Sequence, residues 1–500
     1  MNTIDLMTAP GVTLALLPEL ILTITAGIVL LLAGWRHSSA EDSRLVGWIS
    51  LAGVILSGLA VAYLWSNDYG PAGIPHMVAL DSFRYAALGI FLISAGVTVA
   101  LSLGYMEREG LIAPEYYALI LLATIGMMLL GGAIDFITMF LGLEVMSVAT
   151  YALVAIDRRS AASAEAGLKY FLIGAFASAF LLYGIALVYG PTGSTNILVV
   201  GAQLAGKPLG VMGALGLGML LIGFAFKVSA VPFHMWAPDV YDGAPTPVTG
   251  YMATGIKAAA FIALIRVLMQ AFPGFDALWQ PVVSALAVLT MLVGNLVALT
   301  QRSIKRMLAY SSIAHAGYLL VGVWSGTRLG AAAVLIYLLA YGLTTLAAFG
   351  VLAMLGRGGE RDVTLDELAG LARERPWMAF ALSVCMLSLL GFPGTFGFIA
   401  KWMILSSVIL DGQWVLAVVL VLTSVVSAGF YLPVVMSMYM RDPEPDVDRS
   451  QITVWGAAAG VIALAIVGIL VLGVWPPDLI DLSMETATSL MQQSVPIAAQ

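Results

Sequence analysis

The stretch that decides the fold is residues 209–241, LGVMGALGLGMLLIGFAFKVSAVPFHMWAPDVY. Lys227 is the only charged residue before Pro232 in this run. A continuous helix of that length would be about 50 Å long, well over the roughly 30 Å hydrocarbon core of a bilayer. Proline lacks a backbone donor and clashes with the preceding turn. The run therefore predicts a transmembrane helix that is broken near Val228–Pro232.

A second long run, residues 377–410, carries its own breaking sequence. Gly391, Pro393 and Gly394 interrupt it, and Lys401 follows the interruption. Broken helices in corresponding positions of two halves indicate a transport site built on repeats. We expect two five-helix repeats, 115–273 and 280–440, each with its fourth span broken. Because each repeat has an odd number of spans, the second repeat is inserted into the membrane upside down relative to the first repeat. An N-terminal three-helix segment (1–110) and a C-terminal helix with a tail (452–500) complete the predicted organisation.

The composition of the whole chain agrees with this interpretation. Of its 500 residues, 61% are hydrophobic and 10% are charged, whereas about a quarter of the residues of a soluble protein are charged. Strands with unpaired backbone groups have no hydrogen-bond partners at membrane depth. We therefore predict an all-α polytopic membrane protein with about fourteen spans. These begin near Val12, Val46, Ser82, Tyr116, Phe136, Gly167, Leu209, Val248, Pro281, Lys305, Gly330, Trp377, Gln413 and Thr453.

Cysteine, histidine and charge content exclude several kinds of site. One cysteine, Cys385, is too few for disulfides, thiolate-bound iron–sulfur clusters or cysteine zinc sites. Four histidines leave little for a metal cage, and a net charge of −7 does not favour a nucleic-acid partner. We expect no cofactor in this chain and a lipid bilayer as its surroundings.

Basic residues indicate the orientation, since they accumulate in cytoplasmic loops. Most of the basic residues in the loops between spans, such as Arg108, Arg158 and Arg306, are predicted on one side of the membrane. The opposite side has Lys207 and Arg328. This distribution places both termini in the periplasm, and the Ala- and Gly-rich composition favours a bacterial inner membrane.

Four ionisable residues are predicted near the bilayer midplane: Glu144, Lys227, Lys257 and Lys401. Such groups are costly in lipid and usually mark ion or proton paths. Burial favours neutral lysine, whereas a nearby carboxylate favours the charged form, so a lysine can be made to switch. A purely structural Glu144–Lys227 salt bridge is the alternative, but it leaves Lys257 and Lys401 without acidic partners in their own spans.

Other polar residues in or near the spans receive separate interpretations. His315, about ten residues into its span, is a candidate for the relay, and His234, just after the first break, is a weaker one. We expect Arg266 to snorkel to the headgroups, and Glu19 to cap its helix or face the interface. Asp239 and Asp242 are expected to lie in a turn at the channel mouth, outside the relay. Residues 364–367, Thr-Leu-Asp-Glu, have the spacing of a capping box for a surface helix.

Four motifs resemble those of the antiporter-like membrane subunits of proton-pumping NADH:quinone oxidoreductase, respiratory complex I. They cover much of the chain in the expected order. They are Leu141-Gly-Leu-Glu-Val-Met-Ser147, the segment 226–247 that starts Phe-Lys-Val-Ser-Ala-Val-Pro-Phe-His, the segment 305–318 that starts Lys-Arg-Met-Leu-Ala-Tyr-Ser-Ser, and Gly391-Phe-Pro-Gly-Thr-Phe-Gly-Phe-Ile-Ala-Lys-Trp402.

Among these subunits, the N-type is the most similar. The chain ends soon after its last span, without the long lateral helix of the L-type, and has Lys401 where the M-type carries glutamate. The resemblance implies that Glu144 and Lys227 form the input pair, Lys257 the central relay, His315 part of the hydrophilic axis, and Lys401 the output lysine. It also implies other membrane subunits of complex I as partners.

The resemblance further implies that NADH, FMN, iron–sulfur clusters and quinone are bound by other subunits of the complex. This chain has no glycine-rich loop between a strand and a helix that would bind NADH. Subunits of multi-subunit cation/proton antiporters and membrane-bound hydrogenases share the lysine motifs and are the main alternative. A stand-alone solute transporter and a purely structural subunit fit the buried charges less well.

Overall fold

A computed structural model describes residues 2–35, 40–67, 69–71, 77–356, 363–443 and 454–492. In its first half the elements are β1 (Asn2–Ile4), α1 (Ala9–Ala15), α2 (Leu17–Trp35), α3 (Ala40–Ser66), β2 (Tyr69–Pro71), α4 (Ser82–Arg108), α5 (Glu115–Gly132), α6 (Phe136–Val154), α7 (Ala161–Thr192), α8 (Ile197–Leu204), α9 (Gly210–Lys227), α10 (Trp236–Gly243) and α11 (Thr246–Tyr251).

The second half contains two short π-helical segments, η1 and η2, within one membrane span. Its elements are η1 (Met252–Ile256), α12 (Lys257–Arg266), η2 (Val267–Ala271), α13 (Asp276–Ala298), α14 (Ile304–Trp324), α15 (Arg328–Leu355), α16 (Leu371–Glu374), α17 (Pro376–Leu390), α18 (Phe396–Leu410), α19 (Trp414–Met440), α20 (Gly456–Val474) and α21 (Pro477–Gln492). Residues 493–500 of the predicted C-terminal tail lie outside the described part of the chain.

Thirteen spans in the described residues are long and apolar enough to cross a membrane. The shorter apolar helices α17 and α18 together make the fourteenth predicted span. The predicted polytopic helical fold is therefore confirmed. The small parallel pairing of β1 with β2 was not predicted.

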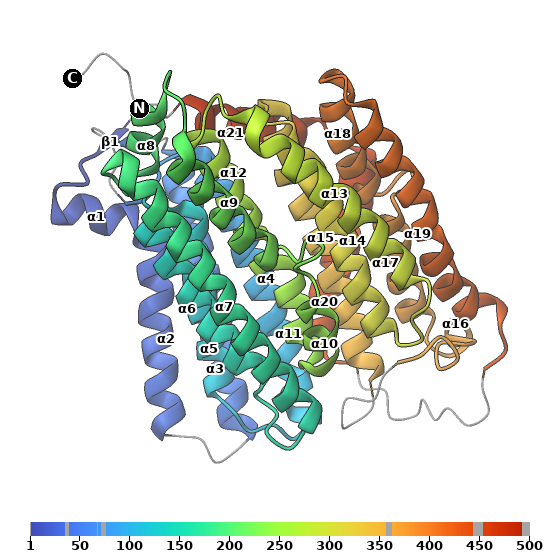
Figure 1. Ribbon diagram of the computed structural model, residues 1–500. Coiled ribbons are helices and arrows are strands. Elements are labelled where there is room, and N and C mark those ends of the chain that lie inside the picture. Colours follow the sequence, from blue (N-terminus) through green and yellow to red (C-terminus); the bar gives the residue numbers. More distant parts are fainter. Residues whose placement is uncertain are drawn as a thin grey trace.

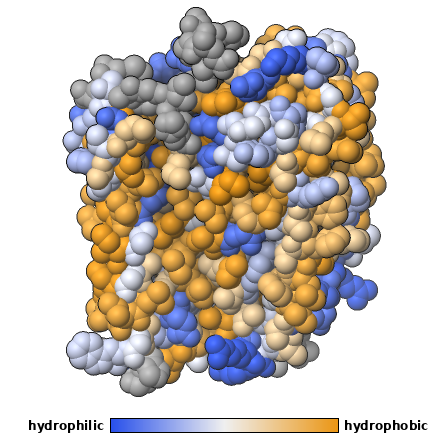
Figure 2. Space-filling view, turned by 60° about the vertical axis from the view of Figure 1, so that its left-hand side comes forward, coloured by the Kyte–Doolittle hydropathy of each residue, from blue (hydrophilic) through white to orange (hydrophobic). Residues whose placement is uncertain are grey.

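Two faces of the bundle are distinguished below. The α21 face carries α1, α8 and α21 at the top of Figure 1, and the α10 face carries the 155–160 loop at the bottom. Between the two faces, apolar side chains dominate the surface, as Figure 2 shows for one side. Leu141, Val148 and Phe176 are examples of large apolar residues exposed there. This belt is the surface that a bilayer requires of a membrane protein.

Small residues allow the closest helix contacts. A Cβ on Gly126 of α5 would lie 2.3 Å from the backbone nitrogen of Met146, and one on Gly142 of α6 would lie 2.5 Å from that of Leu130. Glycine at both positions lets the two backbones touch, as is common between membrane helices. Corresponding pairs pack in each half: α5 with α6 and α13 with α14, and α7 with α9 and α15 with α17. The inverted repeat itself, with the boundaries 115–273 and 280–440, stays a prediction.

Two sequence-based expectations about single charges were wrong. Arg266 does not reach the headgroups: its side chain is fully buried, and its Nη1 and Nη2 donate to Asp81 at 2.8 and 3.1 Å. Glu19 does not face the interface either, because its Oε1 accepts from the buried Arg84 at 2.6 Å. The Asp81 Oδ1 also accepts from the Arg84 backbone nitrogen, and so joins the two pairs. Each charge is neutralised inside the protein because its partner comes from another span.

The predicted capping box forms, but no long surface helix follows it. The backbone nitrogen of Thr364 donates to Glu367 Oε2 at 3.0 Å, and that of Glu367 donates to Thr364 Oγ1 at 3.4 Å. Turns follow, and the short α16 begins at Leu371. Leu368 and Leu371 are buried, so this segment packs onto the bundle.

Replacing Asp81 with asparagine is expected to destabilise the chain strongly. Asparagine preserves the helix cap but leaves the buried Arg266 charge unpaired, and breaking a buried ion pair costs about 3–5 kcal/mol. The matched control is Glu107→Gln, whose Arg44 pair is about half exposed and should matter little. Thermal unfolding of the purified full chain in detergent measures both. Equal shifts of the two midpoints would contradict the assigned role of the buried pair.

Candidate functional site

Lys227 ends the first half of the first broken helix. It is the last residue of α9, and residues 228–235, which include Pro232, separate it from α10. Its side chain is 2% exposed, and its Nζ donates to Ser147 Oγ of α6 at 2.7 Å. The rings of Tyr151 and Tyr170 each lie 5.7 Å from the same Nζ. A helix C-terminus carries partial negative charge, so this position favours an ammonium group.

Glu144 lies one turn before Ser147 on α6 and is half-buried. Its carboxylate is close enough to Lys227 for electrostatic attraction, but the described residues contain no ion pair between them within 4.0 Å. Its Oε1 is buried without a hydrogen-bond partner among these residues. A closed, merely structural salt bridge is therefore not what the structure contains. The lysine bonds instead to Ser147, which lies one turn from Glu144 on the same helix.

Lys257 is the first residue of α12 and directly follows the π-helical segment η1. Segments of this kind occur frequently at functional sites. The lysine is 2% exposed, and its Nζ donates to the carbonyl of Ser312 at 2.8 Å and also to the Ser312 hydroxyl. This partner belongs to α14, so Lys257 joins the two predicted repeats. Among the described residues, no acidic side chain forms an ion pair with Lys257.

His315, one turn after Ser312, is surrounded by tyrosines. Its Nδ1 lies 2.7 Å from the hydroxyl of Tyr337 and its Nε2 3.2 Å from that of Tyr431. The Tyr431 hydroxyl also contacts Ser311 Oγ. A neutral imidazole needs one donor and one acceptor, and a tyrosine hydroxyl can be either. Both tautomers of His315 are therefore satisfied, and a proton can enter at one nitrogen and leave from the other.

Lys401 lies in α18, just beyond the second break. Its Nζ donates to the carbonyl of Leu390 at 2.9 Å and to Ser424 Oγ at 2.8 Å, and it lies 4.8 Å from the centre of the Tyr318 ring. Leu390 is the last residue of α17, so its carbonyl has no partner in its own helix. The break therefore creates the acceptor that holds the lysine. Gly391 allows the turn with a φ of 85°.

The two breaks thus place both lysines at the ends of half-helices. Lys227 lies in the last turn of α9, and Lys401 reaches back to the last carbonyl of α17. In sequence, one lysine precedes its break and the other follows. In space, both ammonium groups belong to the C-terminal end of a first half-helix, where a cation is favoured. Pro393 and Gly394 lie in the second break and are exposed.

The central residues form one electrostatic group. The charges of Lys257 and Lys401 both act on His315, and Ser312 connects Lys257 to the helix that carries the histidine. Among the described residues, no side-chain hydrogen bond brings His234 into this group. It is half-buried beside the first break, and its Nδ1 has no partner within the described residues.

Charged residues line a cleft of about 320 Å³ on the α10 face. Asp239 bridges Lys169 and Arg306, at 3.2 and 3.1 Å, and Asp242 pairs with Arg306 at 3.4 Å. Glu165 pairs with Lys169 at 2.7 Å. Asp239 and Asp242 therefore lie in an ion-paired cleft, in helix α10 and not in the expected turn. The buried Lys305 is close by, since its Nζ donates to the carbonyl of Ala244 at 2.6 Å.

Sequence reasoning missed the hydroxyl groups. Ser147 holds Lys227, Ser424 holds Lys401, and Tyr337 and Tyr431 hold His315. Among these hydroxyls, only that of Ser147 could have been suspected from the sequence, because Ser147 follows Glu144 by three residues and so shares a helix face with it. Within the described residues, no cluster of three or more His, Cys, Asp or Glu is placed to hold a metal ion. The arrangement suits proton transfer between lysine, imidazole and hydroxyl groups.

Residues 133–427 match the family described as NADH:quinone oxidoreductase/Mrp antiporter, transmembrane. This segment contains all the buried lysines and His315. The chain belongs to this family.

Named relatives match the chain almost from end to end. NADH-quinone oxidoreductase subunit N of Trichlorobacter lovleyi is 43% identical and covers 94% of this chain and 96% of its own. The protein of the same name from Gemmatimonas aurantiaca is 43% identical, with coverage of 99% and 97%.

Solved structures show the same fold. A chain of respiratory complex I from Thermus thermophilus with bound aureothin is 36% identical, with a TM-score of 0.79 and coverage of 93% and 98%. A chain of the Mrp complex from Dietzia sp. is 24% identical, with a TM-score of 0.81 and coverage of 95% and 97%. At that identity, the second likeness shows the fold alone.

Replacing Gly391 with alanine should destabilise the chain more than replacing Gly412. Both glycines have positive φ angles, 85° and 74°, so backbone strain should lower the stability of either alanine variant by about 1–2 kcal/mol. A Cβ at Gly391 also lies 2.8 Å from Lys401 Cδ, whereas the space at Gly412 is open. Overpacking adds roughly 1–3 kcal/mol. Thermal unfolding in detergent compares the two variants, and a larger loss for Gly412→Ala would show that the contact is unimportant.

Proposed function

We propose that this chain is the N-type, proton-translocating membrane subunit of an NADH:quinone oxidoreductase. The observation that carries the proposal is that three of the buried lysines, Lys227, Lys257 and Lys401, are each held by a hydroxyl or carbonyl group and are in no direct ion pair among the described residues. Family membership and relatives of one name at 43% identity support it. In such a complex, NADH oxidation and quinone reduction belong to other subunits, and neighbouring membrane subunits are its partners.

In the proposed relay, Glu144 and Lys227 form the input element. A carboxylate close to the lysine stabilises its ammonium form, whereas burial favours the neutral amine. A small movement of either helix therefore changes which form prevails, and Ser147 keeps a hydrogen-bond partner for the amine in both cases. The lysine then releases or takes up its proton according to the position of Glu144.

The proton next passes along the central residues. Lys257 is the middle member, and His315 with Tyr337 and Tyr431 connects it with the second half of the bundle. Lys401, at the second break, is the output member. His315, with a tyrosine hydroxyl at each ring nitrogen, takes the proton up at one nitrogen and releases it from the other. His234 remains a possible additional member beside the first break.

Orientation follows from the basic residues. We propose that the α10 face is cytoplasmic, since basic residues accumulate there, and that the described ends of the chain lie in the periplasm of a bacterial inner membrane. The cleft of Lys169, Asp239, Asp242 and Arg306 then opens to the cytoplasm. Basic residues assigned to that side are Arg44, Arg108, Arg158, Arg159, Lys169, Arg302, Lys305, Arg306, Arg373, Arg375 and Arg441, against Lys207 and Arg328 on the other.

A subunit of a cation/proton antiporter or of a membrane-bound hydrogenase is the alternative function. It would use the same lysines with a different coupling partner. The relatives that match most of this chain at 40–43% identity favour the quinone oxidoreductase. NADH-driven pumping by a complex that contains this chain separates the two.

Replacing Lys227 or Glu144 with alanine should lower proton pumping and the coupled electron transfer while the complex still assembles. Each change removes one charge of the input pair, so the proton affinity of the other group no longer switches. Proton uptake by reconstituted vesicles, driven by NADH and a quinone, measures the effect. Lys207→Ala, at an exposed loop lysine, is the control. Unchanged pumping stoichiometry in both input variants would refute the proposed relay.

Tyr431→Phe should slow pumping roughly tenfold, because a hydrogen bond to a charged or titrating group is worth about 1.5–3 kcal/mol. The ring and its packing stay in place, and only the hydroxyl that bridges His315 and Ser311 is lost. Tyr183→Phe, at an exposed tyrosine of α7, is the matched control. The same vesicle assay applies, with assembly checked by gel filtration. Equal rates in the two variants would remove Tyr431 from the relay.

A further inference from the structure

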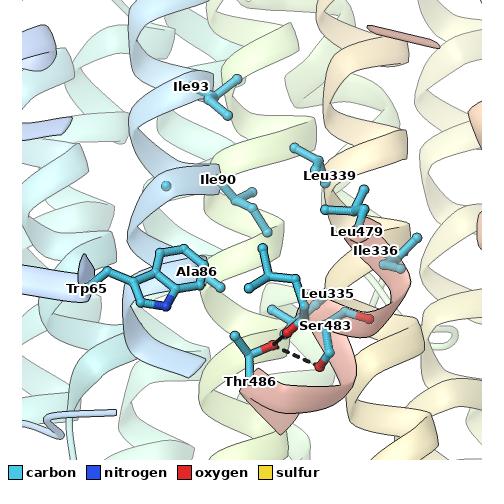
Figure 3. A pocket seen from close by; sticks show the side chains of 12 residues that line it. Trp65, Ala86, Ile90, Ile93, Leu335, Ile336, Leu339, Leu479, Ser483 and Thr486 are labelled. Atoms are coloured by element: carbon cyan, nitrogen blue, oxygen red, sulfur yellow. Dashed lines mark hydrogen bonds between the residues drawn. The ribbon is translucent and has the colours of Figure 1, made fainter. Parts of the chain in front are cut away.

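An apolar groove lies between α3, α4, α15 and α21 (Figure 3). Its volume is about 210 Å³, and its walls include Trp65, Ile90, Leu335, Leu339 and Leu482. Apolar cavities of this order stay dry, and one of about 150 Å³ holds benzene. The groove is therefore suited to a segment of a hydrocarbon chain.

The two hydroxyl groups in the wall are not available to a ligand. Ser483 Oγ donates to Ile480 O at 2.7 Å, and Thr486 Oγ1 donates to Leu482 O and Ser483 O at 3.0 and 2.8 Å. Figure 3 shows the Thr486 bonds turned into α21. Among the other lining side chains, only the Trp65 indole carries a polar atom. This chemistry favours an alkyl chain over a polar solute.

The groove lies in the half of the bilayer next to the α21 face. Its α15 residues, Leu335 and Leu339, follow Arg328 at spacings of seven and eleven residues, and so share one helix stripe with it. Arg328 begins α15, about 10 Å above Leu335 along the axis. It is exposed, and among the described residues its guanidinium donates only to Thr488 Oγ1, at 3.3 Å. The charge therefore stands at headgroup level directly above the groove.

A carboxylate lies near the same position on α21. Glu485 is exposed and lies one turn before Thr488, the residue that Arg328 contacts, whereas the exposed Asp478 is ten residues, about 15 Å, from Thr488. A phosphate group near Arg328 would gain a charge-assisted contact, and a nearby ammonium group would be attracted to the Glu485 carboxylate. A headgroup with both charges fits this surface better than a purely anionic one.

We propose that the groove binds one acyl chain of a phospholipid that carries a primary amine, with its phosphate at Arg328 and its ammonium near Glu485. The lipid fills the space between α4, α15 and α21, and so attaches the amphipathic α21 to the bundle. This site is separate from the proton relay and does not depend on it.

Photolabelling tests the proposal in the purified complex that contains this chain, reconstituted in nanodiscs. The probe is a phosphatidylethanolamine with a diazirine on one acyl chain, and mass spectrometry locates the labelled peptides. Labels are expected on the α4 and α15 peptides that contain Ile90 and Leu339. Phosphatidylglycerol with the same acyl chain should label them less. Equal labelling by the two lipids, or stronger labelling by a diazirine-bearing quinone, would overturn the proposal.

Gly89→Leu supplies the decisive variant. Gly89 lines the groove, and a Cβ there meets nothing within 4 Å, so the leucine fills the groove without strain. Labelling should fall roughly fivefold, equivalent to about 1 kcal/mol of binding free energy. Gly27→Leu, at an exposed and equally open glycine of α2, should leave it unchanged. Full labelling of Gly89→Leu would overturn the proposal.

A second variant tests the proposed contact between Arg328 and the phosphate of the lipid headgroup. Arg328→Gln removes the cation above the groove but keeps a polar side chain, so phosphatidylethanolamine labelling should fall by a similar factor. Lys207→Gln, at another exposed basic residue of the same face, is the matched control and should have no effect. Equal losses in both variants would show that net surface charge, and not this site, attracts the lipid.

Discussion

A lysine inside a lipid-embedded protein must find a hydrogen-bond partner within the protein, because the surrounding lipid supplies none at that depth. This constraint shapes the structure around Lys227, Lys257 and Lys401. Each ammonium group is held by a serine side chain of another helix, and Lys257 and Lys401 also by a carbonyl. None of these partners carries a charge. A neutral partner can accommodate both the ammonium and the amine, so the lysines keep the freedom to exchange protons.

Buried arginines in the same bundle, unlike the three lysines, have carboxylate partners. Arg84 and Arg266 are as deeply buried as the lysines, but each is paired with a carboxylate, from Glu19 and Asp81 respectively. A buried ion pair holds both groups in their charged forms. The ion-paired arginines near the α21 face thus stabilise the fold. The lysines at the centre of the bundle remain free to gain and lose protons. Broken helices make this possible at Lys401, since the break frees the Leu390 carbonyl.

The spans and breaks could be predicted from sequence because they depend on local properties. Run length, Pro232 and the Gly391–Gly394 turn each act within a few residues. The same holds for the buried position of Lys227, Lys257 and Lys401. The pairing of Arg266 with Asp81 could not be predicted, because it joins residues 185 positions apart. For the same reason, the hydroxyls of Ser424 and Tyr431 could not be assigned to their partners. An apolar run shows which residues cross the membrane, but not which helix lies opposite.

The central claim is that protons move sideways through the interior between Glu144 and Lys401. A density map of the intact complex that resolves ordered water molecules tests it most directly. The account predicts water molecules that complete a hydrogen-bonded path from Lys227 through Lys257 and His315 to Lys401. Continuous dry packing between these side chains, in every state of the working complex, would contradict it.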